Sequence, residues 1–156
     1  MATLGMDFIS QDVHPKSAPN EKYNLKIWDT AGQERFKSLT MTFYKQSQGM
    51  MICFDLTKPK TFESVRRWVT AVEKNCEAGI TTMLIGTKCD KNDERAVTRD
   101  EAEALAAEHN MMYFETSARS NINIQEAFSE MIDAVYSKKF ADPNAPAPDR
   151  STFKLG

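Results

Sequence analysis

The sequence predicts an α/β fold: a mostly parallel sheet with helices on both faces and an antiparallel hairpin at the N-terminal end. Residues 50–56 and 82–86 are short, nearly continuous apolar runs, a pattern typical of strands that are covered on both faces. Segments with helical apolar spacing at 61–78, 98–109 and 124–136 follow these runs in alternation. Strands that alternate with helices in this way favour a parallel sheet over a helical bundle or an all-β fold.

The predicted hairpin comprises strands at residues 5–14 and 22–29. In the second strand Tyr23, Leu25 and Ile27 alternate with more polar neighbours, as in a strand with one buried face. Residues 15–21, PKSAPNE, contain two prolines and an asparagine and are predicted to form the turn. After the hairpin, residues 38–48 are ambiguous and fit a short helix.

The second half of the chain completes the predicted domain. The helix at 98–109 is expected to be capped by Thr98 or Asp100, and residues 111–114 form a further apolar strand. From residue 141 the sequence is rich in proline. We therefore expect one domain over residues 1–140 and a disordered tail over 141–156.

Composition excludes several classes of protein. The 156 residues carry a formal net charge of −2, which does not suggest a nucleic-acid binder, and no apolar run reaches the length of a membrane span. The cysteines are Cys53, Cys76 and Cys89, without the spacing of a zinc site or a disulfide framework. We expect a reducing, cytoplasmic location, with Cys53 buried as a small apolar residue of its strand.

Residues 28–36, WDTAGQERF, are the most informative stretch. Asp29 ends a predicted strand and can hold a magnesium ion through a water. Gly32 has no side chain, so its N–H can approach a phosphate closely, and Gln33 can orient an attacking water. A bare D-x-x-G is common in ordinary turns, but the nine-residue string resembles the second switch segment of Rab-type small GTPases of the Ras superfamily.

Two later strings resemble the guanine-reading loops of that family. Residues 87–90, TKCD, are similar to the usual Asn-Lys-x-Asp, which implies that Asp90 accepts two donors of the guanine edge while the stem of Lys88 packs over the ring. Thr87 replaces the usual Asn, with loss of an amide that ties neighbouring loops together. The charged residues 91–95 that follow are expected to be an ordinary solvated loop.

Residues 115–119, ETSAR, resemble the last guanine loop. The resemblance implies that the backbone N–H of Ala118 meets the carbonyl oxygen of the base and that Ser117 braces the base-reading carboxylate. Arg119 stands where a lysine is more usual. Residues 3–8, TLGMDF, resemble the end of the first switch, in which the hydroxyl of Thr3 would ligate magnesium only when the third phosphate is present.

Aromatic residues of the predicted hairpin and of the segment after it have two interpretations. In the first interpretation, an exposed patch for effectors is formed by Phe8, Trp28 and either Phe43 or Tyr44. In the second interpretation, the same residues pack in the core. For Trp28 the sequence favours neither.

No G-x-x-x-x-G-K-[ST] phosphate loop occurs in the sequence. The resemblance begins at Thr3, so we expect the family's first strand, phosphate loop and first helix to be missing. The strands at 22–29 and 50–56 would then have open inner edges or pair with each other. No cysteine follows Cys89, so no prenylated C-terminal anchor is visible.

The resemblance implies a vesicle-traffic switch that binds and hydrolyses GTP with Mg²⁺ and cycles between GTP and GDP, impaired here because the phosphate loop is absent. Its partners would be Rab-type effectors, exchange factors and activating proteins. Whether the chain is an active enzyme stays open. The alternatives are a non-catalytic, Rab-like protein-binding module and a truncated fragment.

Overall fold

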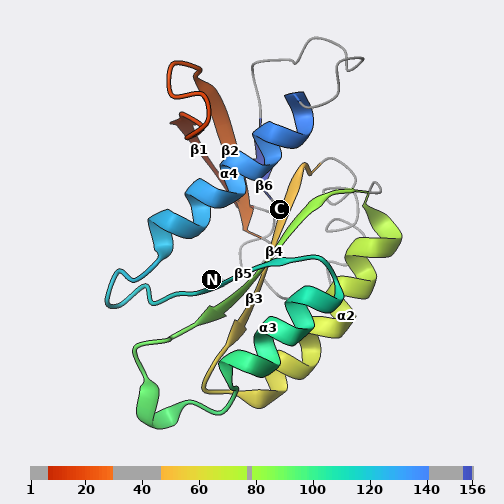
Figure 1. The fold of residues 1–156 in the computed structure, drawn as a ribbon, viewed down its shortest axis with the longest axis vertical. Helices are drawn as coiled ribbons and strands as arrows, with labels where there is room; N and C mark the ends of the chain where they lie inside the picture. The colour runs from red at the N-terminus through yellow and green to blue at the C-terminus, as the bar shows by residue number, and fades with distance from the viewer. Residues whose placement is uncertain (1–6, 30–46, 77–78, 141–152, 156) are drawn as a thin grey trace.

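The computed structural model describes residues 7–29, 47–76, 79–140 and 153–155, and Figure 1 shows their fold. The strands form a six-stranded sheet in the order β1-β2-β6-β3-β4-β5, and all neighbours except β1 and β2 are parallel. The elements are β1 (Asp7–Val13), β2 (Tyr23–Asp29), β3 (Gly49–Asp55), α2 (Pro59–Asn75), β4 (Thr81–Thr87), η2 (Asn92–Glu94), α3 (Arg99–Glu108), β5 (Met112–Glu115), α4 (Ile124–Phe140) and β6 (Phe153–Leu155). The predicted α/β class is confirmed.

The N-terminal hairpin has the predicted topology. Strands β1 and β2 pair antiparallel from Asp7↔Asp29 to Val13↔Tyr23. The connection is a polar turn, in which the ring of His14 contacts the backbone oxygen of Glu21 at 2.8 Å. The prolines of this segment cannot continue a strand, which explains why the chain reverses here.

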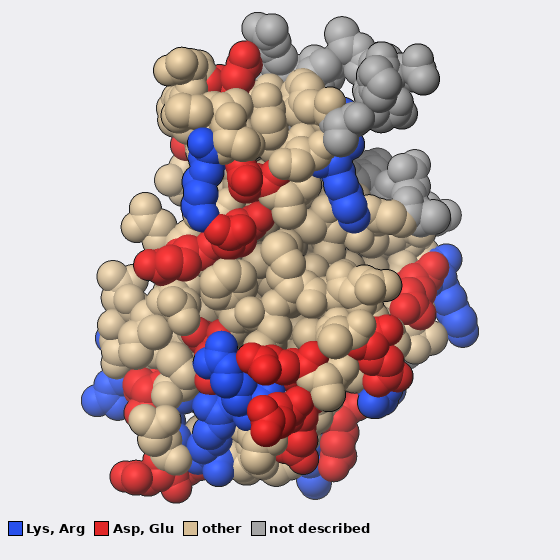
Figure 2. Space-filling model, in the orientation of Figure 1, with Lys and Arg blue, Asp and Glu red and all other residues tan. Residues whose placement is uncertain are grey.

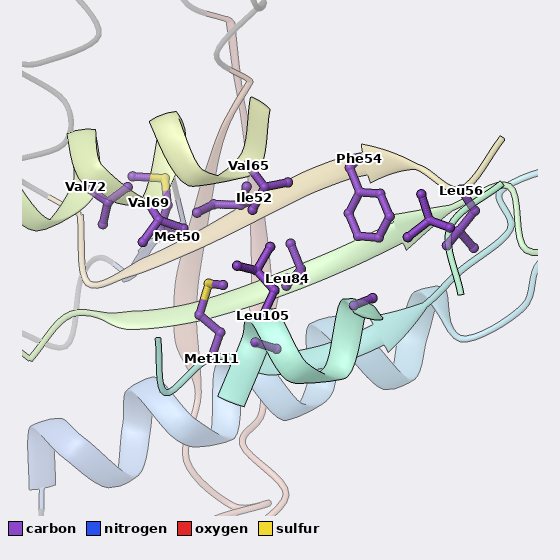
Figure 3. Close-up of a cluster of buried hydrophobic side chains, with 13 residues drawn as sticks. Met50, Ile52, Phe54, Leu56, Val65, Val69, Val72, Leu84, Leu105 and Met111 are labelled. Carbon is purple, nitrogen blue, oxygen red and sulfur yellow. The ribbon is translucent and has the colours of Figure 1, made fainter. Parts of the chain in front are cut away.

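The sheet separates two apolar clusters, as expected for helices on both faces. On one face, Met50, Ile52 and Phe54 of β3 pack against α2 and α3, a cluster that Figure 3 shows in detail. On the other face, Met83 and Ile85 of β4 pack against α4 together with the buried side of β2. Successive side chains of a strand point to opposite faces, so β3 and β4 contribute to both clusters.

Local signals set where the helices begin. Helix α2 starts at Pro59, two residues before the predicted start, because proline fits the first turn of a helix, where its missing N–H has no partner to lose. Of the two predicted caps, Thr98 and Asp100, it is Thr98 that caps α3, where it forms a capping box with Glu101. The predicted short helix at 38–48 lies almost entirely outside the described residues.

Two features differ from the sequence-based expectation. Cys53 is exposed rather than buried, because it lines a cavity beside the ends of β3 and β4. Within the tail predicted to be disordered, residues 153–155 form β6, which lies between β2 and β3. The two inner edges therefore neither stay open nor pair directly with each other along this stretch. The rest of the tail lies outside the described residues.

On the face drawn in Figure 2, Lys and Arg side chains are interspersed with Asp and Glu, most densely over its lower part. Among the described residues, no helix is both long and apolar enough to cross a membrane.

Candidate functional site

The candidate site lies at the carboxyl edge of the sheet. Because β2, β3, β4 and β5 run parallel to one another, their last residues, Asp29, Asp55, Thr87 and Glu115, end at the same edge (Figure 1). Ligands of open α/β sheets bind at this edge. The predicted base-reading loops leave from β4 and β5, so the fold brings them together as the sequence analysis expects.

A cavity of about 480 Å³ opens between these loops. It is lined by all six residues that the resemblance assigns to the base: Thr87, Lys88, Asp90, Ser117, Ala118 and Arg119. Apart from Lys91 and Thr116, its remaining wall is apolar and is formed by Met51, Cys53 and Ile85 of the sheet and by Ile124, Ala127 and Phe128 of α4. A planar, partly apolar ring with polar edges fits such a cavity.

Asp90 is held by a buried hydroxyl. The Oγ of Ser117, which is 1% exposed, donates to Oδ1 of Asp90 at 2.7 Å and accepts from the backbone N–H of Ser120 at 3.0 Å. Among the described residues, Oδ2 of Asp90 accepts no hydrogen bond. The carboxylate is thus oriented by one oxygen and offers the other to a ligand.

The two loops are tied to each other and to the sheet through the backbone. The N–H of Cys89 donates to the oxygen of Thr116 at 3.0 Å, and the N–H of Thr116 donates to the oxygen of Gly86 at 2.8 Å. The hydroxyl of Thr87 donates to the oxygen of Phe54 at 3.0 Å, which joins the ends of β3 and β4. Thr87 therefore provides a tie of its own where an Asn is more usual.

Asp55 fixes Lys88, a contact that the sequence analysis missed. The Nζ of Lys88 lies 2.7 Å from Oδ2 of Asp55, and both the backbone N–H and the hydroxyl of Thr57 donate to Oδ1. Burial opposes the charged form of Asp55, but the hydrogen bonds from Lys88 and Thr57 prevail and lower its pKa to about 2. Lys88 also has a φ of 62°, a left-handed conformation that disfavours a side chain with a Cβ.

Asp55→Asn is expected to lower the free energy of unfolding at pH 7 by about 1–2 kcal/mol, because it removes the charge that pairs with Lys88. The expected loss is no larger because the half-exposed Lys88 is partly screened by solvent. A carboxyl whose folded pKa is depressed stabilises the protein above its unfolded pKa, near 4, and loses this effect as the pH falls towards 2. Urea unfolding at pH 7 and pH 3 would measure this. Equal destabilisation by Asp55→Asn at both pH values would contradict the proposed coupling, and Asp93→Asn, in the exposed η2, is the control.

Another ion pair, more buried than that of Lys88 with Asp55, supports the loop after β5. Arg95 binds the carboxylate of Glu115 with both terminal nitrogens, at 2.9 and 2.5 Å, and the hydroxyl of Tyr113 donates to the same group at 2.6 Å. The side-chain amide of Asn123, at a φ of 57°, donates to the backbone oxygen of Glu115 at 2.9 Å. This network lies directly before Thr116 and Ser117 and fixes the path of the chain into the cavity.

Most of the other predicted site residues lie outside the part of the chain that the structure describes. Thr3, Gly32 and Gln33 lie outside the described residues, and of Asp29 only the backbone is described, at the end of β2. Their roles stay predictions. Among the described residues no group of three or more His, Cys, Asp or Glu side chains could hold a metal ion.

Phe8 and Trp28 form a pair on the hairpin. They face each other across β1 and β2, with ring centroids 4.7 Å apart, and Phe8 is 52% exposed. The interpretation as an exposed residue therefore fits Phe8, whereas Trp28 is half-buried; neither residue belongs to a core cluster. Phe43 and Tyr44, the other members of the predicted patch, lie outside the described residues, so the effector role of the patch stays a prediction.

Residues 1–137 match the Ras family. The chain is a member of the Ras family. It is similar to the Ras-related protein Rab-13 of Rattus norvegicus, with 40% identity over 131 residues, or 84% of this chain and 63% of the relative. It is also similar to the Ras-related protein Rab-8A of Gallus gallus, with 36% identity over 157 residues, or 99% of this chain and 74% of the relative.

These comparisons confirm the Rab-type resemblance. The Ras-family chain spans about 63% of the length of the Rab-13 relatives that it matches. For this chain, the activities and partners of the full-length relatives are therefore proposals, which rest on the geometry of the cavity.

Proposed function

We propose that this Ras-family chain binds a guanine nucleotide in the cavity between the loops after β4 and β5, as part of a Rab-type GTP switch of vesicle traffic. The observation that carries the proposal is the carboxylate of Asp90, oriented by Ser117 at 2.7 Å and lining the 480 Å³ cavity. Asp90 is half-buried and fixed by Ser117, and its carboxylate still has room to accept hydrogen bonds, so it selects a ligand that presents two adjacent donors.

Guanine presents such donors, because its ring N1–H and its 2-amino group lie side by side on one edge. Adenine has an unprotonated ring nitrogen in the corresponding place, so it would leave the carboxylate unpaired. The backbone N–H of Ala118 has no hydrogen-bond partner among the described residues and suits the carbonyl oxygen on the same base. The stem of Lys88, held by Asp55, would cover one face of the ring.

Hydrolysis belongs to the same proposal and rests on the family resemblance. Gln33 would orient the attacking water, Gly32 would approach the phosphates, and Thr3 and Asp29 would hold a Mg²⁺ ion, which neutralises phosphate charge when bound. The 156 residues contain no G-x-x-x-x-G-K-[ST], so this chain by itself is expected to hydrolyse GTP poorly or not at all.

The chain is expected to bind GDP and GTP weakly, and to prefer both to ADP and ATP. Each missing charge-assisted phosphate contact removes roughly 1.5–3 kcal/mol of binding, whereas the base contacts stay in place. Titration with fluorescent GDP and ADP, with Mg²⁺ and without it, measures both effects. Equal binding of the two bases would overturn the proposed function, and submicromolar binding of GDP would contradict only the expected weakness.

A further inference from the structure

Strand β6 joins two parts of the sheet. Among the described strands it is the only one that pairs both with the β1–β2 hairpin and with the β3–β4–β5 part. It pairs parallel with β2 at Leu25↔Phe153, Lys26↔Lys154 and Ile27↔Leu155, and with β3 at Gly49↔Leu155. In Figure 1 the β6 label lies between the hairpin and β3, beside the C-terminus.

The strands on either side of β6 are interior strands. Tyr23 and Leu25 of β2 and Met50 and Ile52 of β3 are all at most 6% exposed. Backbone groups of buried strands need hydrogen-bond partners, and no direct pairing of β2 with β3 is found in the described residues. The slot between them therefore requires an extended segment.

We propose that the slot between β2 and β3 is a strand-binding site, and that residues 153–155 of the same chain occupy it as an exchangeable strand. The occupant enters parallel to both neighbours, so the site selects direction as well as extended backbone. Beyond Gly49, β3 has no strand partner on this side among the described residues, so the slot is longer than its occupant.

The length of chain favours the protein's own segment over that of a second copy. Helix α4 ends at Phe140, and residues 141–152 connect it to β6. A connection of this length spans at most about 40 Å when extended. A tethered segment also has an effective concentration of roughly millimolar, above the micromolar concentration of a second copy in solution.

Occupation of the slot acts on the end of β2. The residues that pair with β6, Leu25 to Ile27, directly precede Trp28 and Asp29. Binding of the tail strand therefore orders the part of the hairpin that leads into residues 28–36. This effect concerns the sheet and does not depend on whether a nucleotide binds.

Nuclear magnetic resonance of the full wild-type chain tests the pairing directly. We expect backbone contacts between Lys26 and Lys154, and amide protection at Leu25 to Ile27 that is unchanged on roughly hundredfold dilution. Absence of the contacts would overturn the proposal. Protection that falls on dilution would show that a second copy fills the slot and would overturn the proposed occupant.

Two proline variants test whether the strand is exchangeable. Lys154→Pro and Leu155→Pro remove N–H groups that point to opposite edges of β6, and Lys154→Ala is the matched control. We expect the proline variants to lose protection at residues 25–27 by roughly ten-fold or more, with residues 83–85 of β4 still protected. They should also bind a labelled peptide of residues 151–156 more tightly than the wild type does. Unchanged protection at 25–27, or peptide binding no tighter than wild type, would overturn the proposal.

Discussion

Asp90→Asn is expected to weaken binding of GDP by roughly 10- to 150-fold and to leave binding of ADP unchanged. One or two charge-assisted hydrogen bonds are lost, at about 1.5–3 kcal/mol, and about 1.4 kcal/mol corresponds to a tenfold change in affinity. The substituted amide presents a donor where guanine also donates. The oxygen that replaces Oδ1 still accepts from the hydroxyl of Ser117, so the loop itself should keep its conformation.

The matched control is Asp93→Asn, which removes the same charge from the exposed η2, outside the cavity. Titrations followed by nuclear magnetic resonance suit the weak binding expected for this chain and report both nucleotides in the same way. If Asp90→Asn and Asp93→Asn reduced GDP binding equally, the effect would come from net charge, and Asp90 would not read the base.

The geometry of the base-reading residues follows from the sequence because each loop leaves the end of a strand. Parallel strands bring these ends to one edge, which predicts that the two loops meet there. The contact of Ser117 with Asp90, 27 positions apart, was implied by the family resemblance. The contact of Lys88 with Asp55 could not be predicted from the sequence. It depends on β3 lying next to β4 and on the left-handed backbone at Lys88, which no spacing specifies. The acidic residue directly after the apolar run of β3 was the available signal.

Strand β6 and the exposure of Cys53 could not be predicted from the sequence, for a different reason. A strand as short as Phe153–Leu155 has no measurable periodicity, and it follows a Pro-rich segment that favours disorder. It pairs with β2 and β3, which lie far from it in the sequence, and no local pattern specifies such long-range pairing. Cys53 is exposed because it lines the cavity between the loops, whereas an apolar run predicts cover on both faces.

Arg95→Met is expected to lower the free energy of unfolding at pH 7 by about 3 kcal/mol, the largest stability effect among these variants. Arg95 binds Glu115 with two nitrogens, and its Nε also donates to the oxygen of Val97 at 2.8 Å. The substitution keeps most of the apolar stem but leaves a carboxylate that is only 8% exposed without its cation. Removing one partner of a buried ion pair costs more than the pair contributes, because the other charge stays buried.

The pH dependence of this effect separates lost charge pairing from lost packing. The hydrogen bonds from Arg95 lower the pKa of Glu115 despite its burial. Its stabilising effect is therefore complete above the unfolded pKa, near 4.3, and is lost as the pH falls through the lower folded pKa. Denaturant unfolding from pH 7 down to pH 3 should show the difference between wild type and Arg95→Met become smaller.

Arg99→Ala provides the comparison, because Arg99 is 3.9 Å from the same carboxylate but its side chain is 62% exposed. We expect it to change the free energy of unfolding by no more than about 1 kcal/mol, as for exposed ion pairs. Equal losses for Arg95→Met and Arg99→Ala, or a loss for Arg95→Met that is the same at every pH, would refute the role of the buried pair. In either case the support of the Thr116–Ser117 loop would have to come from the amide of Asn123 and the backbone ties of β5.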